Sequence, residues 1–140
     1  MRILVVSLLF PLPTNVARGT FVSDNVKLLE SMGHEIKVVN PLPRMLKYQE
    51  SSRSTLTGVS QAPKQFTHGD TQVIAPRFWG LPGHPYPSIT MRSMKRIAKK
   101  VESWLGDWTP EIIICHTMWP AGDLASRLAK RMDIPWVGIV

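Results

Sequence analysis

The chain has 140 residues, of which 44% are hydrophobic, and 17 Lys and Arg face 10 Asp and Glu, for a net charge of +7. This length supports one domain with a real core, and the composition excludes a wholly disordered chain. The longest apolar run, Ile3–Phe10, is far shorter than the roughly 20 residues that span a bilayer, so we expect no transmembrane helix.

The first residues resemble a secretory signal only in part. Met1 and Arg2 give a positive start before an apolar run, but no small-residue cleavage site follows, so a buried first strand is the favoured interpretation. The single Cys115 cannot form an internal disulfide, and its apolar neighbours predict a buried, inert thiol. Both features favour a cytoplasmic location.

Strands and a helix are predicted to alternate over the first 40 residues. RILVVSLLF, residues 2–10, is the near-continuous apolar run typical of a parallel strand covered on both faces. A helix is predicted from Thr20 to Met32 and stops at Gly33. Its expected apolar stripe consists of Phe21, Val22, Val26, Leu29 and Met32. HEIKVVN, residues 34–40, then completes a right-handed βαβ unit.

The segment that follows has a different character. Residues 41–70 contain several prolines and the sequence SSRSTLTG, with no sustained period, so we predict a long loop that is mobile from about residue 44 to 70. A strand is expected at TQVIAPRF, residues 71–78. The proline-rich WGLPGHPYPS, residues 79–88, is expected to turn the chain into the next helix.

The helix predicted over Ser88–Leu105 has two distinct faces. Its apolar positions at helical spacing are Met91, Met94, Ile97, Ala98, Val101, Trp104 and Leu105. Its basic stripe consists of Arg92, Lys95, Arg96, Lys99 and Lys100. A solvated outer face is the plain interpretation, and attraction to an anionic membrane surface is the main alternative. Nucleic acid is disfavoured, because no nucleic-acid module or array of stacking aromatics is present.

The last third predicts a strand at residues 111–118, a helix at residues 121–132 and a strand at residues 134–140. Five strands alternating with three helices indicate a doubly wound α/β fold. We expect a mainly parallel, Rossmann-like sheet with helices on both faces and ligands beyond the carboxyl ends of the strands.

The first candidate ligand loop runs over residues 11–19. Gly19 just before a helix allows backbone N–H groups to approach an anion, Arg18 adds a positive charge, and Thr20 begins the helix. In the alternative, Gly19 only permits a tight turn and Thr20 caps the helix. A dinucleotide site is disfavoured, because the GxGxxG motif needs three glycines and this loop supplies one.

The second candidate loop is HTMWPAG, residues 116–122. His116 at the end of a buried strand can hydrogen-bond a phosphate or hydroxyl or move a proton, although a core histidine bonded to backbone is equally compatible. Trp119 and Gly122 follow it in the loop and the next helix. No metal site is expected, because the other histidines show no ligand spacing with His116 and there is no HExxH or cysteine pair. GxSxG and Walker motifs are also missing.

Taken together, these segments resemble the N-terminal domain of family 4 glycosyltransferases with the GT-B fold. The resemblance rests on MRILVVSLLFP, RGTFVSDNVKLLESMGHEIKVVNPLP, VIAPRFW and EIIICHTMWPAGDLASRLAKRMDIPWVGIV, and leaves out residues 44–70. The chain is most similar to the bacterial subgroup that builds capsular or teichuronic-type polysaccharides of the cell envelope.

The resemblance implies a two-domain enzyme that moves a sugar, with retention, from a nucleotide-diphosphate donor to a glycan or lipid-linked acceptor, without metal or cofactor. Gly19 matches the glycine facing the donor phosphates, with Arg18 and Thr20 beside it. His116 matches the histidine facing the reacting sugar, with Trp119 and Gly122 after it. Relatives that use lipid-linked acceptors commonly attach to the membrane through basic helices of this domain, which implies a location at the inner face of the plasma membrane.

The sequence also departs from the family. Relatives usually carry Asp where Ala121 stands and often where Glu111 stands, and the family pattern continues past Val140 into acceptor-site residues and a second domain. Residues 1–140 are therefore expected to form an incomplete acceptor-side domain that does not transfer sugar alone. Two alternatives remain: a nucleotide-sugar epimerase on a related scaffold, and a non-catalytic remnant that docks on membranes.

Overall fold

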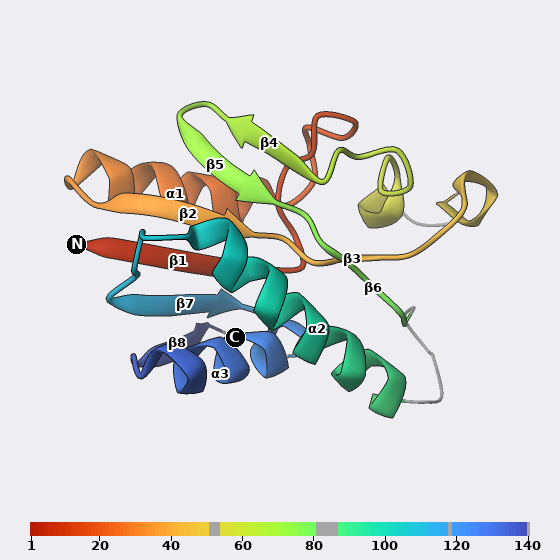
Figure 1. The fold of residues 1–140 in the computed structure, drawn as a ribbon. Helices are drawn as coiled ribbons and strands as arrows, with labels where there is room; N and C mark the ends of the chain where they lie inside the picture. The colour runs from red at the N-terminus through yellow and green to blue at the C-terminus, as the bar shows by residue number, and fades with distance from the viewer. Residues whose placement is uncertain (51–53, 81–86, 118, 140) are drawn as a thin grey trace.

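The computed structural model describes residues 1–50, 54–80, 87–117 and 119–139. In these ranges a six-stranded sheet has the order β4-β5-β2-β1-β7-β8 (Figure 1). Its strands are β1 (Arg2–Ser7), β2 (Glu35–Val39), β4 (Gln65–His68), β5 (Thr71–Ile74), β7 (Ile112–His116) and β8 (Trp136–Ile139). Neighbouring strands are parallel except for β4, which is antiparallel to β5.

The central strand β1 shows why the sheet forms. Ile3–Val6 are all buried, and they alternate between the two faces of the sheet as the pleat requires. The register places Val6 opposite Val39 of β2 and Cys115 of β7. One residue later, Ser7 pairs with His116, so the last residues of β1 and β7 lie side by side.

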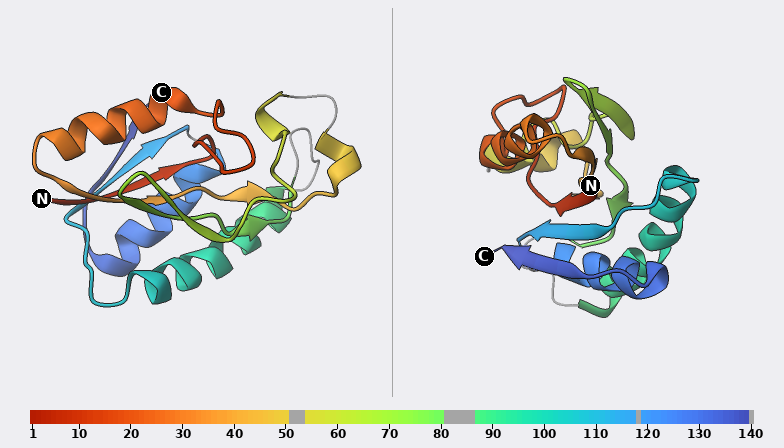
Figure 2. Two further views of the ribbon diagram at one scale, coloured as in Figure 1. Left: turned by 90° about the horizontal axis from the view of Figure 1, so that it is seen from above. Right: turned by 90° about the vertical axis from the view of Figure 1, so that its left-hand side faces the viewer.

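Helices cover both faces of the sheet, which confirms the predicted doubly wound α/β fold. Helix α1 (Thr20–Ser31) packs on one face with Val22 and Val26. Helices α2 (Pro87–Leu105) and α3 (Ala121–Met132) pack on the other (Figure 2). No helix in the described ranges is long and apolar enough to cross a membrane.

Residues 41–70 are more structured than the predicted loop. Besides β4, they contain the short helices η1 (Lys47–Glu50) and η2 (Ser54–Leu56) and the two-residue strand β3 (Leu42–Pro43), which pairs with β6 (Arg77–Phe78). A third core cluster consists of Leu12, Leu42, Val59, Ala62 and Ala75. The expectation of an irregular segment over residues 44–70 is therefore wrong in part: β4 forms within it, and Val59 and Ala62 are buried without a regular period. Its mobility stays a prediction.

All five predicted strands are shorter in the structure, and two of them differ most. The first ends at Ser7, and Leu8–Phe10 continue outside the sheet. The segment 71–78 splits into β5 and β6, which belong to different sheets, and Pro76 between them lacks the N–H that a ladder requires. The predicted turn at residues 79–88 lies largely outside the described residues.

Three residues of the predicted apolar stripes are exposed. Phe21 is 53% exposed, Met32 64% and Met91 39%. Phe21 lies in the first turn of α1 and Met32 is its C-cap residue, and Met91 lies next to the basic positions of α2. Cys115 is buried as predicted, and burial raises the pKa of its thiol to about 11.

Candidate functional site

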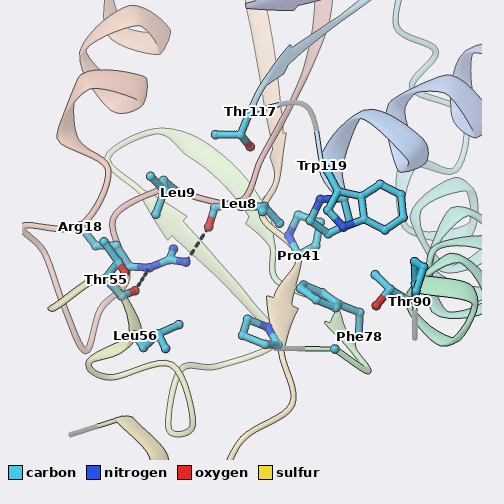
Figure 3. A pocket seen from close by; sticks show the side chains of 14 residues that line it. Leu8, Leu9, Arg18, Pro41, Thr55, Leu56, Phe78, Thr90, Thr117 and Trp119 are labelled. Carbon is cyan, nitrogen blue, oxygen red and sulfur yellow. Dashed lines mark hydrogen bonds between the residues drawn. The ribbon is translucent and has the colours of Figure 1, made fainter. Parts of the chain in front are cut away.

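The carboxyl ends of the parallel strands meet at one edge of the sheet, and the chain leaving β1 and β7 forms a pocket there. The pocket has a volume of about 450 Å³ (Figure 3). Its wall consists of Leu8, Leu9, Arg18, Pro41, Pro43, Thr55, Leu56, Phe78, Gly80, Pro87, Thr90, Thr117, Trp119 and Pro120. A mostly apolar cavity with a few polar groups at this edge is the usual form of a ligand site in an open α/β sheet.

Arg18 lies in the pocket wall, but its guanidinium group is largely committed to the protein. Nε donates to the Thr55 carbonyl at 2.7 Å, and Nη2 donates to the Leu8 carbonyl at 2.5 Å (Figure 3). Nη1 donates to the Phe10 carbonyl at 3.0 Å and to Asn40 Oδ1 at 3.1 Å. Arg18 thus fastens the loop after β1 to the segment around Thr55.

The Arg18 charge has no carboxylate partner among the described residues. Burial lowers the pKa of its guanidinium to about 10, so it remains a cation at neutral pH. Its partner Asn40, at the end of β2, donates from Nδ2 to the Ser7 carbonyl at 2.7 Å. The network positions the strand ends and leaves a positive charge at the pocket wall, whereas a direct role of Arg18 in ligand binding stays a prediction.

Gly19 is required by the packing of the chain on itself. Its φ is +61°, in the left-handed region. A Cβ at this position would lie 2.6 Å from both the Leu9 carbonyl carbon and the Phe10 nitrogen. The glycine therefore lets the loop fold tightly against the residues leaving β1. Whether its backbone also faces a phosphate stays a prediction.

The amino end of α1 has no side-chain cap. Gly19 is the N-cap residue, so the alternative in which Thr20 caps the helix is wrong. Thr20 is the first helical residue and is exposed. The Val22 N–H donates to the Gly19 carbonyl at 3.0 Å, whereas among the described residues the N–H groups of Thr20 and Phe21 have no acceptor. These two donors and the partial positive charge of the helix end favour an anion.

His116 lies beside this helix end. Because it lies on the same face of β7 as Ile112 and Ile114, it faces the side of the sheet that α1 covers. Its ring centroid lies 6.3 Å from that of Phe21 in the first turn of α1, at an interplanar angle of 72°. His116 and the first turn of α1 therefore form one cluster, which we call the His116 cluster.

His116 is buried, with the residue only 4% exposed. No hydrogen bond from the described residues reaches its ring nitrogens, and both nitrogens keep some access to solvent. Burial lowers the pKa of the imidazole, so the ring is neutral at pH 7 and has one donor and one acceptor for a ligand. The alternative of a core histidine bonded to backbone is wrong.

The remaining predicted residues separate into two groups. Trp119 is 52% exposed and lies in the pocket wall, where Figure 3 shows its ring near Phe78 and Thr90. Gly122 is buried in the first turn of α3 and is not part of the wall. Arg18 and Trp119 thus line the pocket, whereas Gly19, Thr20 and His116 are not part of its wall. Gly19 and Thr20 begin the helix whose Phe21 contacts the His116 ring.

Thr117 is a pocket residue that the sequence reasoning missed. Its φ is +69°, which is uncommon for a β-branched residue, and its hydroxyl donates to the His116 carbonyl. Thr90 and Phe78 were also missed, because they come from α2 and β6 and only the fold brings them to the strand ends. The position of Thr117 directly after β7 was the available signal.

The basic stripe of α2 is exposed as predicted. Its members are Arg92, Lys95, Arg96, Lys99 and Lys100. Ile89 and Met91 of the same helix are also exposed, at 41% and 39%. Among the described residues, no three His, Cys, Asp or Glu side chains gather to hold a metal ion.

Comparison with known proteins informs the fold. No family model matches the chain, and no curated protein matches it. Among 13 matching chains of solved structures are two of the C-terminal domain of a hydrogenase from Pyrococcus furiosus. Their TM-scores are 0.53 and 0.55 at 12% and 13% identity, and each match covers 99% of this chain and 90% of that domain. Likeness at this identity supports the Rossmann-like α/β fold alone.

Proposed function

We propose that this chain is the acceptor-side, N-terminal part of a glycosyltransferase of cell-envelope polysaccharide synthesis. It would act on a nucleotide-diphosphate sugar and a glycan or lipid-linked acceptor. The observation that carries the proposal is the His116 cluster: a buried, unpartnered imidazole beside the uncapped amino end of α1. The resemblance of the sequence to family 4 glycosyltransferases supports the same assignment.

In this proposal the donor diphosphate binds at the first turn of α1. Its oxygens accept hydrogen bonds from free backbone N–H groups, and the helix dipole favours their charge. During transfer the bond between the sugar C1 and the phosphate oxygen breaks, and negative charge grows on the departing diphosphate. Donors that are already in place stabilise this charge. The proposal needs no metal or other cofactor.

His116 and the pocket have separate tasks in the proposed reaction. The neutral His116 ring donates a hydrogen bond to the phosphate that carries the reacting sugar, which orients C1 toward the acceptor hydroxyl. The acceptor lies in the pocket, where Phe78 and Trp119 provide apolar surface and the hydroxyl groups of Thr90 and Thr117 provide polar contacts. The acceptor oxygen forms the new bond to C1, and its proton leaves with the diphosphate or with water.

Calorimetric titration with nucleoside diphosphates tests the proposed donor site. Uridine, guanosine, adenosine and cytidine diphosphates are titrated into the wild-type chain, His116→Gln and His34→Gln. His34 is a matched control, because it precedes β2 at the opposite edge of the sheet. We expect at least one diphosphate to bind and His116→Gln to weaken it about tenfold, the usual effect of losing one hydrogen bond to a charged group. Equal affinity of the two variants would count against the site.

The proposal also predicts that the 140-residue chain binds the donor without turning it over. In GT-B enzymes most of the donor site belongs to the second domain, which the resemblance places outside these residues. The measurement is release of nucleoside diphosphate from nucleotide sugars by the purified chain, with His116→Ala as the blank. Turnover above that blank would refute this part of the proposal.

Peripheral membrane binding is a second candidate function, favoured by the exposed face of α2. Its five cations adjoin exposed Ile89 and Met91, and this combination suits an anionic lipid surface. Co-sedimentation with anionic vesicles should fall when Lys95, Lys99 and Lys100 are replaced by Gln. Weak binding, or binding that salt does not reduce, would contradict membrane attachment through this face.

A further inference from the structure

A second cavity, of about 500 Å³, lies between α2, β4 and the segment joining β5 to β6. Four cationic side chains line it: Arg44, Lys64, Arg77 and Lys100. They come from four separate segments of the chain, and α2 contacts β6 beside them. Among the described residues, no carboxylate belongs to the lining. We call this cavity the cationic pocket. It shares no lining residue with the pocket at the strand ends.

Arg77 is the most enclosed cation of the cationic pocket. Its Nη1 donates to the Ala75 carbonyl at 2.5 Å, and its Nη2 donates to the carbonyls of Ala62 at 2.5 Å and Val59 at 3.3 Å. Within the described residues these bonds leave Nε–H without an acceptor and the charge without a counter-ion. Three carbonyls therefore hold the guanidinium group in place and do not neutralise it.

The positive charge of Arg44 makes the charged state of Arg77 less favourable. Burial and then the charge of Arg44 lower the pKa of Arg77, which means that the two guanidinium groups repel each other. Arg44 lies over the Trp79 ring, with Cζ 5.1 Å from the ring centroid. Stacking and backbone hydrogen bonds thus hold two like charges close together, and an anion between them would remove the repulsion.

Elsewhere in the described residues, some arginines have acidic partners. Arg127 pairs with Asp123 at 2.9 Å, and Arg131 pairs with Glu102 at 2.6 Å. Glu102 is the acid closest in sequence to Lys100 and Ser103 of the cationic pocket, but it is engaged with Arg131 of α3. The cationic pocket is therefore left with concentrated positive charge in a concave site.

We propose that the cationic pocket binds the phosphate group of a phosphomonoester or diphosphate. Such a group carries close to two negative charges and several strong acceptor oxygens, which match the four cations. The Arg44 guanidinium can bind phosphate oxygens in pairs, Arg77 offers its Nε–H and its charge, and the lysines at the rim add charge. Ile74 and Pro76 add apolar wall, and the ring of Trp104 with the side chains of Gln65 and Ser103 contacts the remainder of the ligand. The bound phosphate belongs either to a soluble compound or to a lipid headgroup.

Site-resolved titration with inorganic pyrophosphate tests the proposal for a soluble ligand. The amide signals of Gln65 and Ser103 report on the cationic pocket, while signals from the first turn of α1 report on the proposed donor site. We expect the pocket signals to shift, and Lys64→Gln and Lys100→Gln each to weaken that binding about tenfold. Both lysines are exposed, so these variants keep the fold, whereas removing Arg77 would disturb three backbone contacts.

Lys99→Gln is the matched control, because Lys99 is an exposed neighbour on the same helix outside the cationic pocket. It should change the affinity less than twofold. His116→Gln should leave the Gln65 and Ser103 response unchanged, so this test succeeds or fails independently of the proposed donor site. Equal losses in Lys99→Gln and Lys100→Gln would show diffuse attraction to α2 and overturn the proposal.

Vesicles test the lipid source. Phosphatidylcholine vesicles with phosphatidic acid present a phosphomonoester, and vesicles with phosphatidylglycerol present a diester. Preference for phosphatidic acid that is lost in the Lys64→Gln/Lys100→Gln double variant assigns the pocket to a lipid headgroup. Pyrophosphate binding without that preference assigns it to a soluble phosphate. If pyrophosphate does not shift the pocket signals and no preference is seen, the proposal is wrong.

Discussion

Gly19→Ala tests why this loop contains a glycine, and Gly106→Ala is its internal control. Both residues have a left-handed backbone, with φ of +61° at Gly19 and +56° at Gly106. A Cβ at Gly106 meets nothing within 4 Å, whereas a Cβ at Gly19 lies 2.6 Å from two backbone atoms. The two substitutions therefore share the conformational cost and differ in the steric one.

The magnitudes follow from these two contributions. A left-handed alanine costs about 1 kcal/mol after the entropy gained by stiffening the unfolded chain. Relief of the Gly19 contacts needs a backbone shift of several tenths of an ångström, which adds about 2 kcal/mol. We expect a loss of about 1 kcal/mol for Gly106→Ala and about 3 kcal/mol for Gly19→Ala. At this chain length the corresponding falls in Tm are about 3 °C and about 10 °C.

Urea unfolding followed by circular dichroism measures both losses, provided that the slope with denaturant is the same for the two variants. The difference between the two variants is the informative quantity, because errors in the shared conformational cost cancel. Equal destabilisation would refute the view that close packing against Leu9 and Phe10 requires the glycine. Ligand binding would then be the remaining explanation for a glycine at position 19.

Three further predictions concern buried polar groups. Burial lowers the folded pKa of His116, so below about pH 6.5 the unfolded chain binds more protons than the folded chain. The free energy of unfolding should therefore fall more steeply there in the wild type than in His116→Gln, which urea unfolding at several pH values would show. Arg18→Met leaves four acceptors without a donor and should lower the free energy of unfolding by at least about 3 kcal/mol in the same assay. At exposed Arg92, the Arg92→Met change should stay within about 0.5 kcal/mol, and equal losses would contradict the anchoring role of Arg18. Burial raises the pKa of Glu50, but hydrogen bonds from Ser60 and Gly58 lower it overall. The stabilisation by Glu50 is therefore present above about pH 4.3 and is lost as pH falls through the folded pKa. Faster hydrogen exchange of the Gly58 and Ser60 amides in Glu50→Gln would support this, and unchanged exchange would contradict it.

The fold was predictable because its main elements have strong local periods. The run Ile3–Val6 is apolar throughout and is buried on both faces, as a central parallel strand requires. The helix at residues 121–132 has the predicted bounds, with Asp123 in its first turn and basic residues in its last. These patterns depend on neighbours in sequence, so the sequence alone contains them.

The parts that could not be predicted depend on contacts between distant residues. Arg18 donates to the Thr55 carbonyl across 37 positions, and no periodicity indicates such a bond. Strand β4 forms because Gln65–His68 meet β5 after a tight turn, although their composition resembles a loop. The cationic pocket likewise exists only after folding, since Arg44 and Lys100 lie far apart in the chain. The local signals predicted the strand ends but not what surrounds them.

The most direct test of the proposed donor site is to locate a bound nucleoside diphosphate on the chain. Amide resonances are followed while the tightest-binding diphosphate from the calorimetric panel is added to the wild-type chain and to His116→Gln. We predict the largest shifts at Thr20, Phe21 and His116, and a loss of those shifts in His116→Gln at the same ligand concentration. Shifts confined to another surface, or the same shifts in the variant, would contradict the assignment of the donor diphosphate to the amino end of α1.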